Sequence, residues 1–519
     1  MEYNKIDNIV NSQVKFNKSN SNSVNYRIQI LNSLLKSIEK NEEKIYCALK
    51  KDLNKHEFES FLSEILLVKG EIKLFTKKLK RWSKKKKVRG SIFNFPSKNY
   101  LVPEPYGNVL IITPWNYPFQ LSLTPLIGAI AAGNTVIIKP SELAPNTSTV
   151  LRDLIESVFP RNLACVIEGD AKVAKYLLEK KWDYIFFTGS TKIGKIIAEK
   201  AGKNLTPITL ELGGKSPCIV DSAVDIDKVA KRIVSGKFVN CGQTCIAPDY
   251  IVVNSHVKDE LISMIKKNII STYGNSSIKS KSYGRIINKN NLERIKESIK
   301  DQQFEFGGKI DEQNLFIEPS LIIDPDLESD IMNDEIFGPI LPILSYDNDY
   351  EIDKIIERNP SPLAFYIFSK NQNFIDKLIG NFKFGGCVVN DTLIHYINPN
   401  LPFGGIGTSG MGAYRGKFSF DTFTHYKPIL EKKSMIDIPF RYGPYPQTFK
   451  YLNKSGNIQY INNVGRRWSL FQQINFSNAS QPYYVAMMPS GRILTEPIQY
   501  ASEENFEKWL SSSIDESIK

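Results

Sequence analysis

Residues 183–194 read DYIFFTGSTKIG, a short apolar run followed by a turn at Gly189 and the first residues of a helical pattern. The same texture occurs in GNTVIIKPSE (133–142) and in SPCIVDSAVDIDKVAKRIV (216–234). Short apolar runs that alternate with helical patterns indicate parallel β-α-β layering, in which the strands are buried on both faces. The sequence therefore predicts an α/β fold.

The same alternation extends over most of the chain. Between Asn25 and Trp82 apolar residues recur at intervals of three and four, which predicts amphipathic helices. Beyond Lys300 strand-like runs return, and helices are expected around 352–357 and 375–379. A chain of 519 residues is long enough for about two or three domains, so we expect more than one hydrophobic core.

The composition is that of a globular protein, with 42% hydrophobic and 24% charged residues. Its six cysteines have no regular spacing, which argues against a secreted disulfide scaffold and for a reducing compartment. The N-terminus has no signal-peptide pattern, and no uncharged apolar run reaches the length of about 18 residues that a membrane span needs. We therefore expect a cytoplasmic protein without a stable membrane anchor.

The formal net charge of +12 could suit nucleic acid or an anionic membrane surface. However, Lys, Asn and Ile are frequent throughout the chain, which indicates a compositional bias rather than a binding patch. The densest basic run, KKLKRWSKKKKVRG (77–90), is typical of a solvated helix end. We therefore expect no nucleic-acid partner.

Two segments that end apolar strands could hold a cofactor. At Gly189 and Ser190 a strand gives way to a helix, whose free N–H groups favour a phosphate. Only Gly189 and Gly194 stand where a dinucleotide fingerprint has three glycines, and a plain turn capped by Ser190 is the alternative. Lys139 and Glu142 stand at the end of another strand, where they could share ribose hydroxyls; the alternative is an exposed, unpaired surface charge.

Glu211 lies between two leucines and precedes a double glycine in LELGGKSP (210–217). Partial desolvation would raise the pKa of its carboxyl and suit it to general-base catalysis, whereas a carboxylate that caps a loop is the alternative. Asn116 lies between two aromatic residues in PWNYPF (114–119). A buried amide there could stabilise an oxyanion, although an ordinary loop asparagine would also fit.

Cys241 and Cys245 stand four residues apart in FVNCGQTCIAP (238–248). A zinc site is unfavourable because the four histidines, His56, His256, His395 and His425, form no sequence cluster with them, and no metal is expected. If CGQTC lies near a helix start, backbone amides would favour the thiolate of Cys245. Cys241 is then expected to be a small packed side chain.

Taken together, these segments resemble the aldehyde dehydrogenase superfamily, and its class 3 branch most closely. The resemblance covers approximately residues 5–454. It rests on motifs that occur in the family's order and at similar separations: PWNYPF, KPSE, FTGSTKIGK, LELGGKSP, GQTCIAPDY, EIFGP and LPFGGIGTSGMGAYRGKFSFDTFTH.

The resemblance implies NAD(P)-dependent oxidation of a small-molecule aldehyde to a carboxylic acid. Cys245 would attack the aldehyde carbon, and Asn116 with the backbone N–H of Cys245 would hold the oxyanion. Hydride transfer to NAD and/or NADP would leave a thioester, and Glu211 would activate the water that hydrolyses it.

The resemblance also assigns cofactor residues. Lys139 and Glu142 would meet the adenosine ribose, and Gly189, Ser190 and Gly194 belong to the pyrophosphate segment. The remaining matches are Glu335 and Phe337 at the nicotinamide ribose, and Asn390 and Phe403 near the active site. Phe418 stands where class 3 relatives often have a histidine.

The implied architecture has two doubly wound, Rossmann-like domains and a small β oligomerisation arm, and a homodimer is expected. Residues 1–211 would contain the N-terminal helices and the NAD(P)-binding domain, with arm strands near 98–110. Residues 212–400 would form the catalytic domain, and 401–454 the return segment and the rest of the arm. Residues 455–519 would form a linker and a short α+β extension.

Residues 465–514 of this extension resemble the C-terminal half of a thioredoxin-like, thiol-disulfide interchange domain, with Pro482 in the position of its cis-proline. No cysteine follows Cys387, so the redox C-x-x-C pair is missing and thiol-disulfide exchange is excluded there.

Three other functions remain open. An acylating enzyme would pass the acyl group to coenzyme A, and a catalytically inactive relative would keep only the fold. Glu211 argues against the first, and its presence together with Cys245 and Asn116 argues against the second. The basic run could bind an anionic surface. For the leading function we expect a medium-chain aliphatic or aromatic aldehyde and dual use of NAD and NADP.

Overall fold

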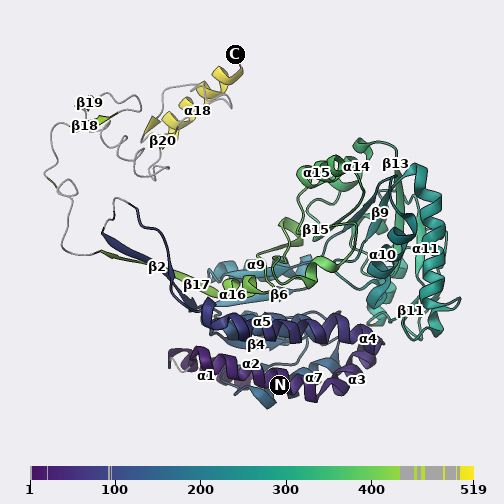
Figure 1. The fold of residues 1–519 in the computed structure, drawn as a ribbon, viewed down its shortest axis with the longest axis horizontal. Helices are drawn as coiled ribbons and strands as arrows, with labels where there is room; N and C mark the ends of the chain where they lie inside the picture. Colours follow the sequence, from purple (N-terminus) through teal and green to yellow (C-terminus); the bar gives the residue numbers. More distant parts are fainter. Residues whose placement is uncertain are drawn as a thin grey trace. The chain divides into compact units, whose positions relative to one another are not determined.

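The computed structural model describes residues 3–19, 22–91, 94, 96–432 and 443, and then five short segments: 449–452, 458–461, 483–484, 498–499 and 503–518. The chain divides into two compact units. The first contains Met1–Phe93 and Ser97–Glu431, and the second contains Asn94–Pro96 and Lys432–Lys519. Figure 1 labels the elements of both units.

The N-terminal part of the first unit is helical, and between Asn25 and Trp82 this confirms the prediction from the spacing of apolar residues. Its elements are α1 (Tyr3–Lys18), α2 (Val24–Lys40), α3 (Glu42–Leu53), α4 (Glu57–Ser60), a π-helical turn η1 (Phe61–Ile65) and α5 (Leu66–Trp82). The apolar stripe of α2 is buried, and this helix packs on α5, on α6 (Gln120–Ala132) and on α7 (Pro145–Val158). These helices form the lower layers in Figure 1.

The first sheet has the order β16-β7-β6-β3-β4-β5. Its strands are β3 (Asn108–Ile112), β4 (Thr135–Lys139), β5 (Ala164–Val166), β6 (Tyr184–Thr188), β7 (Ile208–Glu211) and β16 (Gly410–Met411). All neighbours are parallel except β16, which is antiparallel to β7. Every residue of β3, β4 and β6 is buried, as expected for strands covered on both faces.

The strand order of this sheet reverses next to β3. The chain runs from β3 to β4 and β5 on one side and then returns to β6 and β7 on the other. Helices α8 (Ala171–Leu178) and α9 (Thr191–Lys203) complete the crossovers. Ligands of such sheets bind outside the carboxyl ends of the strands at the reversal, which here lies between β3 and β6.

The second sheet has the order β12-β13-β9-β8-β14-β15, and all of its neighbouring strands are parallel. Its strands are β8 (Pro217–Val220), β9 (Tyr250–Asn254), β12 (Ser320–Ile323), β13 (Ile340–Tyr346), β14 (Ala364–Phe368) and β15 (Gly386–Val389). Two parallel sheets with crossover helices confirm the α/β prediction.

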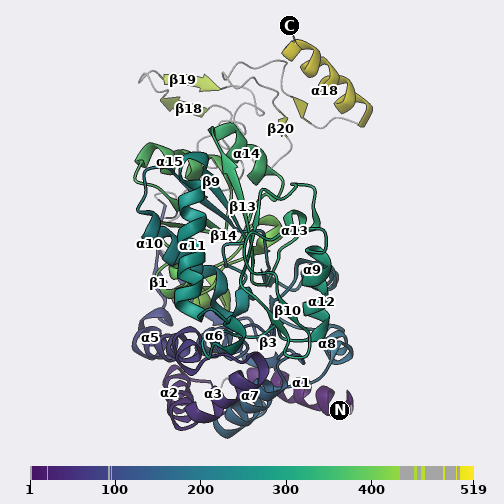
Figure 2. The ribbon, with the colours of Figure 1, turned by 90° about the vertical axis from the view of Figure 1, so that its right-hand side faces the viewer.

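Helices α10 (Ile226–Phe238) and α11 (Lys258–Tyr273) pack against each other beside the second sheet (Figure 2). Helices α14 (Asp349–Glu357) and α15 (Gln372–Asn381) contain the two segments for which helices are predicted. The remaining helices are α12 (Lys289–Ser298), α13 (Asp330–Asn333) and α16 (Lys417–Thr422).

A third, smaller sheet has the order β1-β2-β17. Its strands are β1 (Lys86–Lys87), β2 (Ser97–Pro105) and β17 (Thr424–Lys432). β2 and β17 come from the two segments that the sequence assigns to the arm, whereas β1 precedes them and β3, which begins at Asn108, belongs to the first sheet. A short antiparallel pair joins β10 (Ile310–Asp311) to β11 (Phe316–Ile317).

In the C-terminal unit two antiparallel pairs and one helix are described. The pairs are β18 (Phe449–Leu452) with β19 (Ile458–Ile461), and β20 (Tyr483–Tyr484) with β21 (Ile498–Gln499). Helix α18 (Glu503–Ile518) is the last described element of this unit. Most of the thioredoxin-like prediction, including Pro482, lies outside the described residues.

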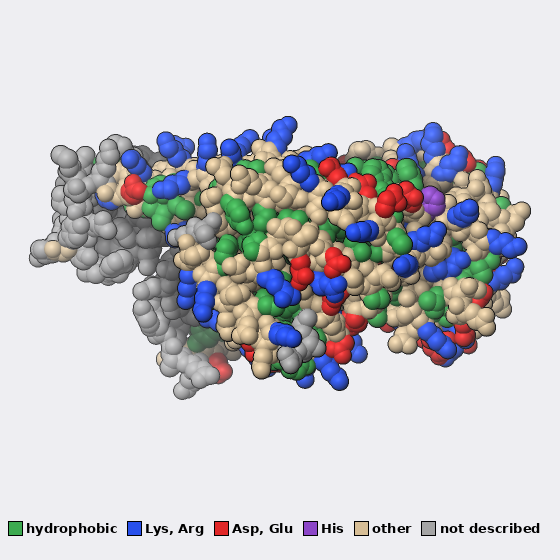
Figure 3. Space-filling model, turned by 90° about the horizontal axis from the view of Figure 1, so that it is seen from below, with side chains coloured by type: hydrophobic (Ala, Val, Ile, Leu, Met, Phe, Trp, Pro, Cys, Tyr) green, Lys and Arg blue, Asp and Glu red, His purple; other side chains and the backbone are tan. Residues whose placement is uncertain are grey.

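The charged side chains are dispersed over the described surface. On the face in Figure 3, lysines and arginines are spread widely, with acidic residues among them. In the basic run, residues 84–90 are all exposed, as expected for a solvated segment. Among the helices that the structure describes, none has the length and apolar character needed to cross a bilayer.

Candidate functional site

The candidate residues gather at two facing edges of the large sheets. On the first sheet they follow strands: Asn116 follows β3, Lys139 ends β4, Gly189 follows β6 and Glu211 ends β7. On the second sheet they precede strands: Cys245 precedes β9, and Glu335 and Phe337 precede β13. The chain passes from β7 to β8 through residues 212–216 only. The carboxyl edge of the first sheet is therefore joined directly to the amino edge of the second.

The loop that carries Cys245 has unusual backbone geometry. After α10 ends at Phe238, Asn240 and Cys241 adopt left-handed conformations, with φ of 51° and 56°. Gly242 follows with φ of 73°, and a Cβ on it would lie 2.3 Å from the carbonyl oxygen of Gly338. Glycine is required here because a side chain would collide with the segment before β13.

The condition under which backbone amides would favour the Cys245 thiolate, a nearby helix start, is not met. After the turn η3 (Val239–Gly242) the next regular element is the strand β9, so Cys245 lies in a loop and not at a helix N-terminus. The pKa of the Cys245 thiol is raised by burial and, to a smaller extent, by the charges of Glu335 and Glu211. The chain alone therefore holds the thiol protonated, contrary to the sequence-based expectation. Cys241 is fully buried, as a packed side chain should be.

Asn116 is buried and joins two loops. Its backbone carbonyl oxygen accepts from Nδ2 of Asn240 at 2.8 Å. Its side-chain Nδ2 donates to the backbone carbonyl oxygen of Gln243 at 3.0 Å. Because a primary amide has two N–H groups, this bond leaves one donor for another acceptor. The amide is thus both fixed to the cysteine loop and able to donate once more.

Glu211 is buried, and neither carboxylate oxygen has a hydrogen-bond partner among the described residues. Burial raises the pKa of this carboxyl well above its usual value, as the flanking leucines predict. Its backbone is fixed, because the N–H of Gly189 donates to its carbonyl oxygen at 3.0 Å. An unpartnered buried carboxylate is costly to the fold and available to a water molecule.

Lys139 and Glu142 form an ion pair of 2.7 Å between Nζ and Oε2. The lysine side chain is 3% exposed and the glutamate side chain 43%, so one end of the pair is buried and the other faces solvent. The alternative of unpaired surface charges is therefore wrong.

The end of β6 and the start of α9 combine a helix cap with a buried hydroxyl that has no partner among the described residues. The Ser190 hydroxyl accepts from the N–H of Ile193 at 3.5 Å and caps α9. The Thr188 hydroxyl is buried without a hydrogen-bond partner in the described chain. Gly194 allows α9 to pack closely, because a Cβ there would lie 2.6 Å from Cδ2 of Leu212. Ile193 is exposed on the first turn of the helix.

Glu335 lies against the double glycine that follows Glu211. A Cβ on Gly213 would collide with the Glu335 carboxylate, and the N–H of Gly214 hydrogen-bonds to it. Burial, together with the charge of Asp249, raises the pKa of Glu335 to about 8. Phe337 has φ of 47°, and its ring meets the Trp115 ring edge-on at 5.3 Å.

Sequence reasoning missed the residues that hold this segment. Asp249 is buried and receives Nζ of Lys215 at 2.7 Å and the N–H of Ile336 at 3.2 Å. Lys237, also buried, lies 3.7 Å from the same carboxylate. Arg294 fixes the other side of the Ile336 peptide by donating to its carbonyl oxygen at 2.8 Å. Lys215 lies in the motif LELGGKSP and Asp249 in GQTCIAPDY. Their place in these motifs is the only sequence feature that indicates a role for them.

Asn390 lies at the second sheet. It follows β15 at the carboxyl edge of the second sheet, where its side chain bonds to the backbone of Ser369. Phe403 is buried and packs on His395, whose ring also contacts Tyr366. The Tyr366 hydroxyl donates to the carbonyl oxygen of Ile246, beside Cys245.

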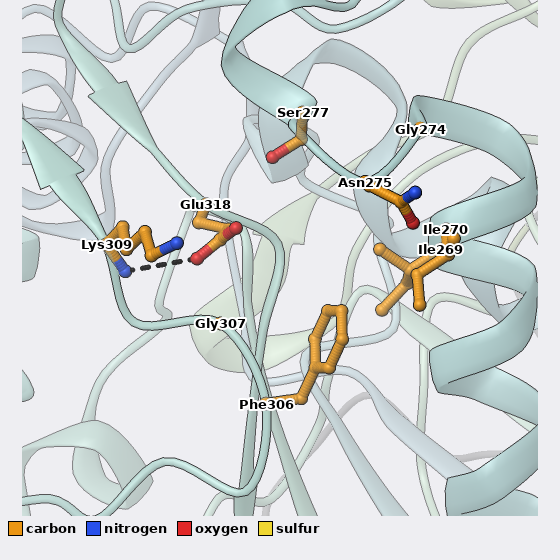
Figure 4. A pocket seen from close by; sticks show the side chains of 9 residues that line it. All are labelled: Ile269, Ile270, Gly274, Asn275, Ser277, Phe306, Gly307, Lys309 and Glu318. Atoms are coloured by element: carbon orange, nitrogen blue, oxygen red, sulfur yellow. Dashed lines mark hydrogen bonds between the residues drawn. The ribbon is translucent and has the colours of Figure 1, made fainter.

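A cavity of about 240 Å³ lies elsewhere in the first unit (Figure 4). It is lined by residues from α11 and from the segments 274–277, 306–309 and 318, none of which is a candidate site residue. In the part of the chain that the structure describes, no three His, Cys, Asp or Glu side chains are grouped as a metal site.

Comparison with known proteins identifies relatives of the whole first unit. The sequence model of the aldehyde dehydrogenase family matches residues 3–429. The 4,4'-diaponeurosporen-aldehyde dehydrogenase of Staphylococcus aureus (strain NCTC 8325 / PS 47) is 46% identical over 443 residues, which are 85% of this chain and 96% of that protein. The aldehyde dehydrogenase family 3 member H1 of Arabidopsis thaliana is 44% identical over 425 residues, covering 81% and 88%.

Solved structures agree. The substrate-bound state of Staphylococcus aureus AldH superposes with a TM-score of 0.83 and 45% identity, covering 85% of this chain and 97% of that one. Glyceraldehyde-3-phosphate dehydrogenase GapN from Methanocaldococcus jannaschii, complexed with NADP, gives a TM-score of 0.76 and 26% identity, with 83% and 95% covered.

Proposed function

The chain belongs to the aldehyde dehydrogenase family, and from this premise we propose which of its residues carry the reaction. The protein is an oxidoreductase that oxidises an aldehyde, with NAD or NADP as cofactor. The proposal concerns Cys245 as nucleophile, Asn116 as oxyanion donor and Glu211 as general base. One observation carries it: Glu211 is buried at the end of β7, and neither of its carboxylate oxygens has a hydrogen-bond partner among the described residues.

In the first step the Cys245 thiol gives its proton to solvent water, and the resulting thiolate sulfur attacks the aldehyde carbon. A C–S bond forms, and the carbonyl π electrons move to oxygen. The free N–H of the Asn116 amide and the backbone N–H of Cys245 donate to this oxyanion. The bond from Asn116 to Gln243 keeps the amide oriented before substrate arrives.

In the second step the oxyanion collapses to a thioester as the carbon loses its hydride. NAD or NADP, held by the cofactor residues named below, would supply the acceptor for that hydride. Glu211 then takes a proton from a water molecule, whose oxygen attacks the thioester carbon. The C–S bond breaks, the carboxylic acid leaves, and the proton held by Glu211 returns to the Cys245 sulfur to restore the thiol.

The cofactor residues are proposed in the same way. Lys139 and Glu142 would hold the adenosine ribose, and Gly189, Ser190 and Gly194 would shape the pyrophosphate segment. The unpartnered Thr188 hydroxyl and the exposed first turn of α9 fit a dinucleotide at that helix start.

Glu335 and Phe337 would meet the nicotinamide ribose. This assignment is supported by the clamp on the Ile336 peptide between them, which Asp249 and Arg294 hold from both sides.

We further propose the domain assignment given by the sequence. The change of sheet between Glu211 and Pro217 supports a boundary near residue 212. The sheet β1-β2-β17 would serve as the oligomerisation arm of a homodimer.

A cytoplasmic location fits the composition and the irregularly spaced cysteines, none of which forms a disulfide among the described residues.

The test is NADH and NADPH formation with a panel of aliphatic and aromatic aldehydes, followed by absorbance, in the intact protein and in Cys245→Ala. We expect medium-chain aldehydes to be oxidised with both cofactors and the variant to be inactive. Product analysis with and without coenzyme A separates hydrolysis from acyl transfer. An intact protein that binds NAD without turnover, or an active Cys245→Ala variant, would overturn the proposal.

A further inference from the structure

We propose that the buried ion pair of Lys55 and Glu64 positions the oxyanion arm, residues 114–120, and thereby sets the orientation of the Asn116 amide. Neither residue belongs to a motif of the sequence analysis, and neither contacts Cys245. The inference rests on the proposed function of Asn116.

The pair is completely enclosed. Both side chains are 0% exposed, and Nζ of Lys55 lies 2.6 Å from Oε1 of Glu64. Removing two charges from water is costly unless their remaining donors and acceptors are also satisfied. Here they are satisfied by the oxyanion arm.

Lys55 contacts the arm at its centre. Its Nζ donates to the carbonyl oxygen of Asn116 at 3.2 Å and stands 4.2 Å from the centroid of the Tyr117 ring. A cation over an aromatic face is attracted by the ring quadrupole. Lys55 therefore fixes the backbone carbonyl of Asn116 and the ring of Tyr117.

Glu64 contacts the end of the arm. Its Oε2 accepts from the N–H of Phe119 at 2.9 Å and of Gln120 at 3.2 Å, where α6 begins. The first N–H groups of a helix have no partner within the helix, and a carboxylate is favoured there. Glu64 lies in the π-helical turn η1, and such turns often accompany functional sites.

The arm in turn is hydrogen-bonded to the cysteine loop. The Asn116 carbonyl oxygen, which accepts from Lys55, also accepts from Nδ2 of Asn240. That same Nδ2 donates to the Gln243 carbonyl oxygen at 3.2 Å, the acceptor of the Asn116 amide. The ion pair thus stands at one end of a continuous set of bonds that leads to the loop of Cys245. It can act on the first chemical step without touching substrate.

The experiment measures the first-turnover formation of NADH in Lys55→Met and Glu64→Gln, together with the dissociation constant of NAD and the thermal midpoint. Glu71→Gln is the matched control. Glu71 is equally buried and accepts from Arg415 at 2.6 Å and from a backbone N–H, that of Gly416, at 2.7 Å, but it does not contact the arm.

We expect Lys55→Met and Glu64→Gln to slow the first turnover by about tenfold or more, since small misplacements of catalytic groups are costly. NAD binding should change less than twofold, and Lys55→Arg should restore most of the rate. Glu71→Gln should lower the thermal midpoint to a similar extent but leave the first-turnover rate within about twofold. In an Asn116→Ala background Lys55→Met should add no further loss, because the pair acts through Asn116.

An unchanged first turnover in both variants, equal slowing in Glu71→Gln, or full additivity with Asn116→Ala would overturn the inference. If Lys55→Met does not fold, Glu64→Asp keeps the charge, shortens the side chain by one methylene and tests the same geometry. A Cys245→Ala variant that still forms NADH would instead refute the proposed function itself.

Discussion

The side-chain amide of Asn116 donates to the backbone carbonyl of Gln243 at 3.0 Å, two residues before Cys245. This hydrogen bond joins the loop of Asn116, the proposed oxyanion donor, to the loop of Cys245, the proposed nucleophile, and fixes their relative position. Such fixed donors stabilise developing charge without reorganisation during the reaction.

Replacement of Asn116 by Ala should slow the first turnover of NADH by about 10²- to 10³-fold, because one preorganised oxyanion donor is lost. Rapid-mixing absorbance measures this rate, and NAD binding should remain unchanged. Asn116→Asp is the control for shape, since it keeps the size of the side chain but loses the donor. A full first turnover in either variant would argue against the oxyanion role.

Glu211→Gln should retain a burst of about one NADH per active site and lose steady-state turnover, since only hydrolysis needs the base. In the intact protein the raised pKa of Glu211 implies that steady-state turnover increases with pH as the carboxyl loses its proton. A pH series with burst analysis measures both effects. A normal steady state in the variant would remove Glu211 from the mechanism.

The same substitution should stabilise the fold at alkaline pH. The folded-state pKa of Glu211 lies above the unfolded value, so its protonated form is favoured in the folded state, and stability is lost as pH rises through the folded pKa. Glu211→Gln removes this loss. Urea unfolding should show a larger gain in the free energy of unfolding at pH 8 than at pH 5, and an equal gain at both would contradict the sign.

Replacement of Glu142 by Ser should shift cofactor preference toward NADP by about tenfold, because a carboxylate repels a 2′-phosphate and accepts from a 2′-hydroxyl. The ratio of kcat/KM for the two cofactors measures the shift. Glu156→Ser changes a carboxylate in the same domain that pairs with Arg161, away from this edge, and should leave the ratio unaltered. No shift in Glu142→Ser would separate this residue from the ribose.

Gly242→Ala should destabilise the protein by at least about 2 kcal/mol, since alanine is strained at φ of 73° and its Cβ would strike the Gly338 carbonyl. Gly202→Ala is the matched substitution in α9, where no atom lies within 4 Å of the new Cβ. It should stabilise by about 0.5–1 kcal/mol through helix propensity. Denaturant midpoints measure both, and the same sign for both would contradict the argument.

The elements that sequence predicts well here are those whose signal is local. β4, β6 and β8 are continuous apolar runs bounded by turn residues, so their strands follow from adjacent positions. The burial of Asn116 and Glu211 follows in the same way from the apolar residues beside them. The family motifs quoted from the sequence then indicate which of these residues belong to one site.

What sequence could not predict depends on distant pairing. Lys55 reads as one more lysine in a lysine-rich part of the sequence, and only the fold places it, between α3 and α4, against Asn116. The sequence left open whether Cys245 lies near a helix start, and left-handed conformations at Asn240 and Cys241 lead the chain into a loop before β9. Asp249 gains its partners from three separate segments.

The wide dispersal of lysines on the surface has a colloidal consequence. Mutual repulsion between molecules, set by the net charge of +12 at pH 7, fades as pH approaches the isoelectric point near 9.1. Turnover, in contrast, gains as Glu211 loses its proton. Concentrated solutions of the protein should therefore aggregate least near pH 7, whereas an alkaline buffer should raise the turnover rate and lower the solubility.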